Sequence, residues 1–263
     1  MSRRLHALLL LLLLSGSFLG AKIAIYGDTR THHDVHARIV AAIAAHQPSL
    51  AFHTGDLVQR GTTEAEYDRW FEISSPLLQL CPIWPAKGNH ERDRDRFISR
   101  FQFPGGSSYY VVEHDSIRWI VLDSTLDLRP GSEQYTWLSQ QLNLAALPII
   151  VFLHHPIFSS GEHGSELGLE LYLPALFESA GVLAVISGHE HQYEHLIHNG
   201  SHYLISGGGG APIRTYGDPS PYSRVLHKKH HYIIAERSSG SLQMKVYDLD
   251  GALLDSFSIP LAH

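Results

Sequence analysis

Cysteine is nearly absent from this chain, since Cys81 is the only one among 263 residues. A single thiol excludes an internal disulfide, so packing alone must stabilise the fold. Runs of basic residues are missing as well: Lys and Arg number 20 against 26 acidic residues, which gives a net charge of -6. This balance indicates no nucleic-acid-binding surface, although it does not exclude a nucleotide as substrate.

Long apolar runs are also missing, with one exception near the N-terminus. Residues 8–14 are an unbroken run of leucine that follows Arg3 and Arg4 and precedes small residues. The run is too short for the roughly 20 residues of a membrane-spanning helix, and the pattern is typical of a secretory signal. We predict a signal peptide over residues 1–20, cleaved near Ser17, with an uncleaved anchor as the alternative. The remaining chain is then exported, either secreted or periplasmic, with no membrane span after removal of the signal.

The rest of the chain changes its pattern once along its length. Strands and helices alternate at first, and the last quarter consists mainly of strands, which predicts a single α/β domain over residues 21–263 with a pair of mixed sheets covered by helices. The expected strands cover residues 22–26, 50–53, 82–86, 109–114, 117–123, 149–153, 182–186, 202–206, 230–236, 242–248 and 252–258. The expected helices cover residues 34–45, 64–80, 132–144 and 167–180. The Gly- and Pro-rich segment 207–229 is expected to form a rim over the functional site.

Histidine is abundant, with 20 residues, and several of these lie in short polar motifs that each end an apolar run. The motifs occur in a fixed order: Gly27-Asp28, Gly55-Asp56, Gly88-Asn89-His90-Glu91, His154-His155-Pro156 and Gly188-His189-Glu190-His191. Glycine precedes four of the polar residues, and its permissive backbone allows the sharp exit that turns the next side chain inward. Singly each motif can be an ordinary turn, but all of them at strand ends indicate a shared site.

The residue types in these motifs indicate a metal centre. Mixed Asp, Asn and His ligands suit manganese, iron or zinc better than calcium, which prefers oxygen ligands only. Two such ions about 3.5–4 Å apart can share one carboxylate and neutralise a phosphoester. No Gly-X-Ser-X-Gly motif is present, so a serine hydrolase of that type is set aside.

On these motifs, residues 23–210 resemble the metallophosphoesterases, the calcineurin-like superfamily, in its branch similar to purple acid phosphatases. The resemblance implies a four-layer α/β/β/α sandwich with a dinuclear centre of manganese, iron or zinc ions. It implies Asp28 and His191 as ligands of the first metal and Asp56 as the bridging carboxylate. It implies Asn89, His154 and His189 as ligands of the second metal, with His155 as the alternative to His154.

The resemblance also implies catalytic residues. His90 matches the histidine that contacts the phosphate and assists proton transfer, and Glu91 would hold the loop or orient His90. Arg60 matches an arginine that grips the phosphate, and a guanidinium fork suits two phosphate oxygens. Its alternative is a surface arginine in a turn. His163 resembles a loop histidine near the leaving group and is a candidate acid.

Two positions depart from the family pattern. Asp28-Thr29-Arg30 lacks the histidine of the Asp-X-His motif of protein phosphatases, and Gln59 stands where purple acid phosphatases have a tyrosine ligand. The first metal is left with few protein ligands, and water or Gln59 can complete its coordination. Arg30 can grip phosphate or replace charge where a ligand is missing. Without the tyrosine, the resemblance implies a colourless protein.

We therefore predict a metal-dependent hydrolase of phosphomonoesters that acts on a small-molecule or protein substrate. One alternative is a phosphodiesterase with the same centre, because the choice lies in the shape of the pocket. Another is an exported metal-binding protein without catalysis, although a purely structural site would not need His90.

Overall fold

The computed structural model describes residues 20–144 and 146–261. The predicted signal peptide, residues 1–20, lies outside the described residues except for Gly20. Within the described part, no helix is both long and apolar enough to span a bilayer.

Two mixed β-sheets form the centre of the molecule. In spatial order, the first sheet contains β13 (Leu253–Pro260), β12 (Ser241–Asp248), β11 (His231–Ser238), β1 (Lys22–Tyr26), β2 (Leu50–His53) and β3 (Ile83–Pro85). The second contains β10 (Ser223–His227), β8 (Tyr193–His198), β9 (Ser201–Ser206), β7 (Val182–Ser187), β6 (Ile149–Phe152), β5 (Ile117–Val121) and β4 (Tyr110–His114). Strands β1, β2 and β3 are parallel, and so are β5, β6, β7 and β9, so the carboxyl ends of each group lie together.

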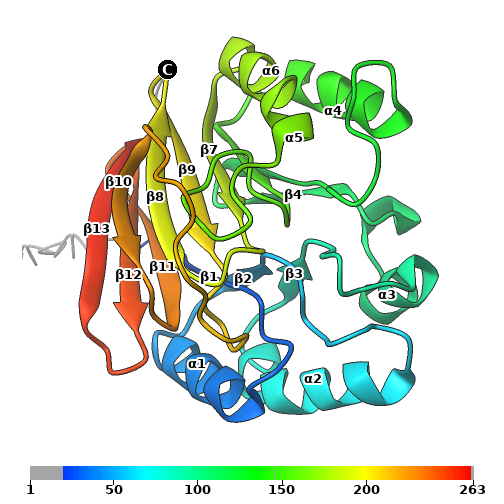
Figure 1. Cartoon of the computed structure of the whole chain (residues 1–263), viewed down its shortest axis with the longest axis vertical. Helices are drawn as coiled ribbons and strands as arrows, with labels where there is room; N and C mark the ends of the chain where they lie inside the picture. Colours follow the sequence, from blue (N-terminus) through cyan, green and yellow to red (C-terminus); the bar gives the residue numbers. More distant parts are fainter. Residues whose placement is uncertain (1–19, 145, 262–263) are drawn as a thin grey trace, which may run out of the picture.

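Helices cover the outer faces of both sheets (Figure 1). The helices on the side of the first sheet are α1 (His33–Ala45), α2 (Glu64–Leu78) and α3 (Arg94–Phe101), and those on the side of the second are α4 (Glu133–Asn143), α5 (Leu167–Glu170) and α6 (Leu173–Ser179). Aromatic rings fill the space between the sheets: Phe52 of β2 stacks on Phe152 of β6 with ring centroids 4.4 Å apart, and Trp119 of β5 lies 5.0 Å from Phe52. The α/β/β/α sandwich predicted from the sequence is confirmed.

Most elements could be predicted because apolar strands alternate with helices along the chain. Three differences from the prediction have physical causes. The expected helix 167–180 is two helices, α5 and α6, with Pro174 in the first turn of α6. Helix α3 escaped prediction because only Phe97 of its eight residues is buried. Strands β8 and β10 were also missed, since their histidines and other polar residues hide the apolar pattern.

One buried histidine in the helical layer predicts a pH effect on stability. His36 of α1 is 1% exposed, lies under Trp70 and is hydrogen-bonded to Ser74 at 3.3 Å. Burial lowers its pKa from 6.5 to about 3, so below pH 6.5 the unfolded chain takes up a proton that the folded chain excludes. The contribution of neutral His36 to the free energy of unfolding is therefore fully present above pH 6.5 and is lost as the pH falls towards 3.

We expect the parent protein to lose about 1.4 kcal/mol more per pH unit in this window than His36→Leu does. Urea unfolding of both proteins at several pH values between about 7 and 4.5 measures the two slopes. Equal slopes would show that His36 does not titrate on unfolding.

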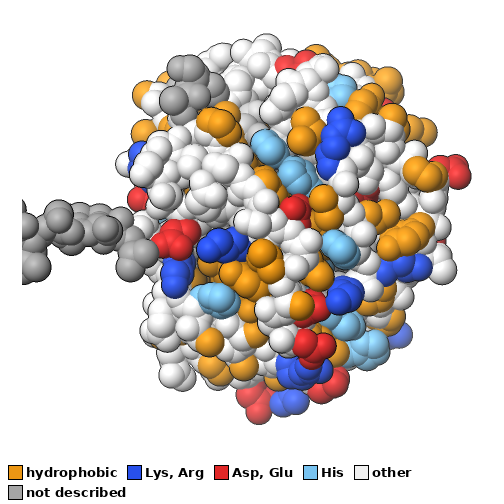
Figure 2. Space-filling model, turned by 90° about the vertical axis from the view of Figure 1, so that its left-hand side faces the viewer, with side chains coloured by type: hydrophobic (Ala, Val, Ile, Leu, Met, Phe, Trp, Pro, Cys, Tyr) orange, Lys and Arg blue, Asp and Glu red, His pale blue; other side chains and the backbone are white. Residues whose placement is uncertain are grey.

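The surface at the edge formed by β13, β12 and β10 carries charges of both signs. Figure 2 shows blue and red side chains interspersed on this face, without a continuous basic stripe. A single-sign field that would attract a polyanion is therefore not apparent on this face.

Candidate metal centre

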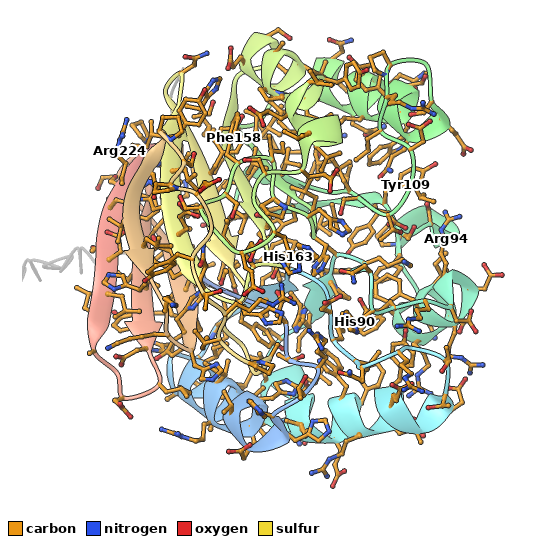
Figure 3. The ribbon with its side chains drawn as sticks, in the orientation of Figure 1. His90, Arg94, Tyr109, Phe158, His163 and Arg224 are labelled. Carbon is orange, nitrogen blue, oxygen red and sulfur yellow. The ribbon has the colours of Figure 1, made fainter. Side chains whose placement is uncertain are left out.

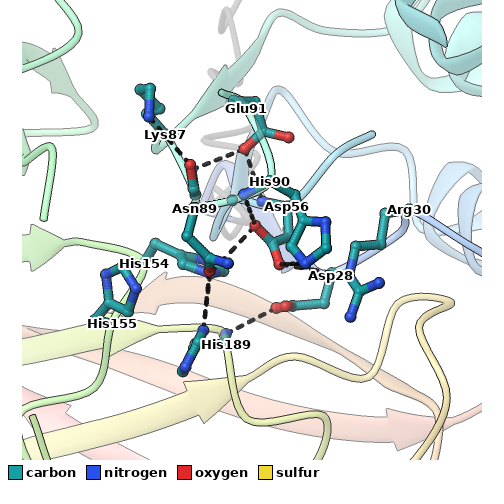
Figure 4. A network of polar contacts seen from close by, with 12 residues as sticks. Asp28, Arg30, Asp56, Lys87, Asn89, His90, Glu91, His154, His155 and His189 are labelled. Carbon is teal, nitrogen blue, oxygen red and sulfur yellow. Dashed lines mark hydrogen bonds and ion pairs between the residues drawn. The ribbon is translucent and has the colours of Figure 1, made fainter. Parts of the chain in front are cut away.

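The predicted ligands come from the carboxyl ends of strands in both sheets. Asp28 follows β1, Asp56 follows β2 and Asn89 follows β3, while His154 and His189 follow β6 and β7. Because the two sheets face each other, these five ends meet at one edge of the sandwich (Figure 4).

The backbone turns into the site by a different device from the one predicted. Asp28, Asp56 and His189 themselves adopt the left-handed conformation, with φ of 57°, 54° and 68°, whereas among the glycines that precede them only Gly55 has a positive φ. The other glycines are needed for close approach. A Cβ on Gly88 would lie 2.2 Å from Asp56 Oδ1, and one on Gly188 would lie 2.4 Å from Asp28 Oδ2.

Asn89, His154, His189 and Asp56 form a compact cluster of potential ligands. Asn89 Oδ1 lies 3.0 Å from His154 Nε2 and 3.1 Å from His189 Nδ1, and the two imidazole nitrogens are 3.3 Å apart. Asp56 Oδ1 is 3.3 Å from His154 Nε2. Asn89 Oδ1, His154 Nε2 and His189 Nδ1 thus lie within 3.3 Å of one another, with Asp56 Oδ1 beside His154. Nitrogen and oxygen donors grouped in this way suit a borderline metal ion.

Hydrogen bonds fix the tautomers of two histidines for ligation. His154 Nδ1 donates to the Thr54 carbonyl oxygen at 2.9 Å, and His191 Nδ1 donates to the Pro212 carbonyl oxygen at 2.7 Å, so each presents an unprotonated Nε2 to the site. Burial lowers the pKa of His154 well below 6.5, and burial together with Arg214 lowers the pKa of His191 to about 3. Both rings are therefore neutral, the form that binds metals.

Asp28 and His191 form a second pair, and Asp28 offers an oxygen within 4.8 Å of ligand atoms of Asp56 and His154. Asp28 Oδ1 and His191 Nε2 lie 3.6 Å apart, are buried, and have no hydrogen-bond partner among the described residues. Burial, with the charge of Asp56, raises the pKa of Asp28 well above 3.8. The other oxygen, Oδ2, accepts the His189 backbone N–H at 3.1 Å and so couples β1 to the β7 loop.

His155, the alternative ligand, lies beside the cluster rather than within its contacts. Its Nδ1 is 2.9 Å from Ser124 Oγ, and its ring centroid is 4.6 Å from that of His189. Among the described residues, the structure records no hydrogen bond or ion pair of His155 with Asn89 or Asp56, whereas His154 contacts both. Ligand atoms of His154, His155 and His189 nevertheless lie within 4.8 Å of one another, so His155 stays an alternative ligand.

His90 and Glu91 lie at the same loop with different contacts. His90 Nδ1 donates to the Gln59 carbonyl oxygen at 2.6 Å, which leaves Nε2 facing Asp56 Oδ2 at 3.8 Å. Glu91 is fully buried and accepts the backbone N–H groups of Asp56, Val58 and Gly88. Glu91 therefore holds the two ligand-bearing loops together.

The two arginines singled out in the sequence lie in different surroundings. Arg60 is exposed; its backbone N–H donates to Glu66, and its side chain has no recorded polar contact with the site within the described part of the chain. Arg30 is only 11% exposed in its side chain, and its Nε lies 3.5 Å from Asp56 Oδ2. Its Nη1 donates to Gln59 Oε1 at 3.2 Å.

His163 lies at the centre together with an arginine that sequence reasoning missed. Figure 3 shows His163 and His90 near the same edge of the sandwich. The His163 ring centroid is 4.7 Å from that of His189, and the backbone N–H of His163 donates to the buried Glu190. Arg214 donates to His163 Nδ1 at 2.6 Å and to the His189 carbonyl oxygen at 3.1 Å. Nothing in the local sequence marks Arg214, because it lies in the irregular segment 207–229.

A cleft of about 710 Å³ opens beside His163. Its walls are the loop 158–167 and the segment 216–222, joined where Gly217 N–H donates to the Ser160 carbonyl oxygen at 2.9 Å. Part of the predicted rim therefore forms one wall. The cleft is large enough for an organic group attached to a phosphate.

Comparison with known proteins agrees with this geometry. The family model for the calcineurin-like phosphoesterases matches residues 21–193. Purple acid phosphatase 18 of Arabidopsis thaliana is 30% identical over 221 residues, which are 72% of this chain and 49% of that protein. A probable glycerophosphodiester phosphodiesterase of Arcobacter nitrofigilis is 30% identical over 160 residues, 56% of this chain and 58% of that protein. The chain thus spans about half the length of these relatives.

The fold is shared with a solved plant enzyme. The purple acid phosphatase PPD1 from yellow lupin superposes with a TM-score of 0.81 at 18% identity, covering 91% of this chain and 53% of that one. From the family model over residues 21–193, with the ordered ligand motifs and the sandwich fold, the chain belongs to the calcineurin-like phosphoesterase family.

Proposed function

We propose that this protein hydrolyses phosphomonoesters at a metal centre of manganese, iron or zinc built on Asp56, Asn89, His154 and His189. The convergence of these four side chains beside His90 is the observation that carries the proposal. The phosphatase among its relatives supports this function. Metal ions here supply Lewis-acid polarisation of a phosphoryl oxygen and neutralisation of its charge.

The chain's own residues have distinct roles in this proposal. His90 presents Nε2 to the centre and moves a proton there, because its Nδ1 is held by the Gln59 carbonyl oxygen. His163, at the mouth of the cleft, protonates the leaving oxygen. Arg214 is better placed than Arg60 to contact the phosphoryl group, since its guanidinium contacts the residues of the centre directly.

A phosphodiesterase is the second candidate function. Relatives from Arcobacter nitrofigilis and Hordeum vulgare carry that activity in their names, and the cleft beside His163 offers room for the second organic group of a diester. Export from the cell, with residues 1–20 as the signal and residues 21–263 as one domain, is part of the same proposal.

Hydrolysis of p-nitrophenyl phosphate and bis(p-nitrophenyl) phosphate tests both candidates. The purified protein is stripped of metal, then restored with manganese, iron or zinc. We expect metal-dependent turnover with the monoester preferred. A preference for the diester would establish the second function, and no turnover of either ester despite bound metal would favour a metal-binding protein without catalysis.

The iron-loaded protein is expected to be colourless. The purple colour of the family's namesakes requires a tyrosinate ligand, and here Gln59 stands at that position with its Oε1 accepting from Arg30. Visible absorption of the iron(III)-loaded protein checks this. An intense band in the visible region would mean that another tyrosine reaches the metal.

A further inference from the structure

The two oxygens of Asp56 face two different partners. Oδ1 lies 3.3 Å from His154 Nε2 and accepts the backbone N–H of His90 at 3.0 Å. Oδ2 lies 3.5 Å from Arg30 Nε. A carboxylate can bridge two metals through both of its oxygens or through one, and in either case it faces two cations. Here one oxygen faces the Asn89 and histidine cluster and the other faces a guanidinium.

Arg30 is held firmly in this position. Its side chain is almost enclosed, and Gln59 Oε1 accepts its Nη1. Among the described residues its buried Nε has no hydrogen-bond partner, and its recorded ion pair is with Asp56. Arg30 stands where protein phosphatases have a histidine ligand, and Gln59 stands where purple acid phosphatases have a tyrosine ligand. Because Arg30 and Gln59 contact each other, both replaced ligand positions lie at the same side of the centre.

The two halves of the centre therefore differ in how well they fit a metal ion. Asn89, His154 and His189 offer ligand atoms 3.0–3.3 Å apart, and Asp56 Oδ1 lies 3.3 Å from His154 Nε2, so this half fits one ion. On the other side, Asp28 Oδ1 and His191 Nε2 are correct donors without partners. Asp56 Oδ2, however, faces the positive charge of the Arg30 guanidinium, which opposes the binding of a second cation beside it.

A count of formal charges leads to the same result. When both carboxylates are ionised, Asp28 and Asp56 contribute two negative charges, and both side chains are fully or almost fully buried. One divalent ion with Arg30 leaves the centre at +1, which attracts a phosphate, whereas two divalent ions with Arg30 leave it at +3. Like charges this close, away from water, repel strongly enough to weaken binding of the second ion by on the order of 100-fold or more.

We propose that the centre holds a single resident metal ion, in the cluster of Asp56, Asn89, His154 and His189, and that the Arg30 guanidinium takes the place of the second cation. Asp28 and His191 then form a latent site that Arg30 keeps from filling. This inference rests on the proposed function only for the role of the centre, because the number of bound ions is measured without substrate.

Metal stoichiometry tests the proposal directly. Parent protein, Arg30→Lys and Arg30→Met are each loaded with manganese(II), desalted and analysed by plasma mass spectrometry. We expect one ion per chain for the parent and for Arg30→Lys, which keeps the charge, and two for Arg30→Met, which removes it. Electron paramagnetic resonance adds a second readout: an isolated manganese spectrum for the first two proteins and an exchange-coupled pair for Arg30→Met.

Arg94→Met is the matched control, since Arg94 also lies beside a buried carboxylate, 3.8 Å from Asp123, but contacts none of the proposed ligands. It is expected to keep one ion. Circular dichroism confirms that each variant is folded before its metal is counted. Two tightly held ions in the parent, or one ion in folded Arg30→Met, would overturn the proposal. One ion in a parent without turnover would instead uphold this inference and remove the proposed function.

Discussion

Replacing Asp56 by asparagine is expected to release the metal and to lower kcat/KM for p-nitrophenyl phosphate by on the order of 1,000-fold or more, since metal coordination contributes several kcal/mol of charge stabilisation. The Asp56 carboxylate faces His154 with one oxygen and Arg30 with the other. The amide keeps the shape of the carboxylate but not its charge. Asparagine also tolerates the left-handed backbone of this position, so the fold should remain.

Metal analysis and steady-state kinetics at saturating metal separate the two effects. Asp127→Asn serves as the control, because Asp127 is paired with Arg129 at the surface, in none of the recorded contacts of the centre, and should keep parent activity. If Asp56→Asn kept both its metal and its turnover, Asp56 could not be a ligand, and the assignment of the centre would fail.

The second large effect is expected for His90→Ala, which should retain the metal and lose on the order of 100-fold to 1,000-fold in kcat. His90 contacts Asp56 by its backbone N–H and presents only Nε2 to the centre, outside the converging ligand atoms. Alanine preserves the backbone contact and removes the imidazole. The loss should therefore fall on turnover rather than on metal content.

His32→Ala, which removes an exposed histidine, serves as the control and should keep the kcat of the parent. Full activity of His90→Ala at saturating metal would mean that another group transfers the proton, with His163 as the next residue to test.

The order of the motifs allowed the fold and the meeting point of the ligands to be predicted. Each of Asp28, Asp56, Asn89, His154 and His189 follows an apolar run, and the ends of parallel strands meet at one sheet edge. That inference needs only local periodicity and a general rule of sheet geometry. The distance between the two sheets does not enter into it.

What could not be predicted depends on contacts between distant segments. The ion pair of Arg30 with Asp56 and the hydrogen bond of Arg30 with Gln59 join residues almost 30 positions apart. Arg214 reaches His163 from a segment without periodicity, about 50 positions away. In both cases the sequence contains the residue but no signal for its partner, because side-chain direction in loops is set by tertiary packing.

Asp28, Asp56 and His189 adopt a left-handed backbone that lowers the stability of the fold at the three positions that supply predicted ligands. A residue with a Cβ adopts this conformation at a cost of roughly 1–2 kcal/mol, which glycine avoids. Without a metal, glycine at His189, whose backbone N–H would still donate to Asp28, should therefore make the fold more resistant to heat than histidine does. Glycine at Asp28 or Asp56 would instead remove the acceptor of the His189 or His90 backbone N–H, which offsets the relief of strain. A descendant of this chain that no longer needed catalysis could lose His189 and become more stable by doing so, which makes the active centre easy to lose and hard to regain.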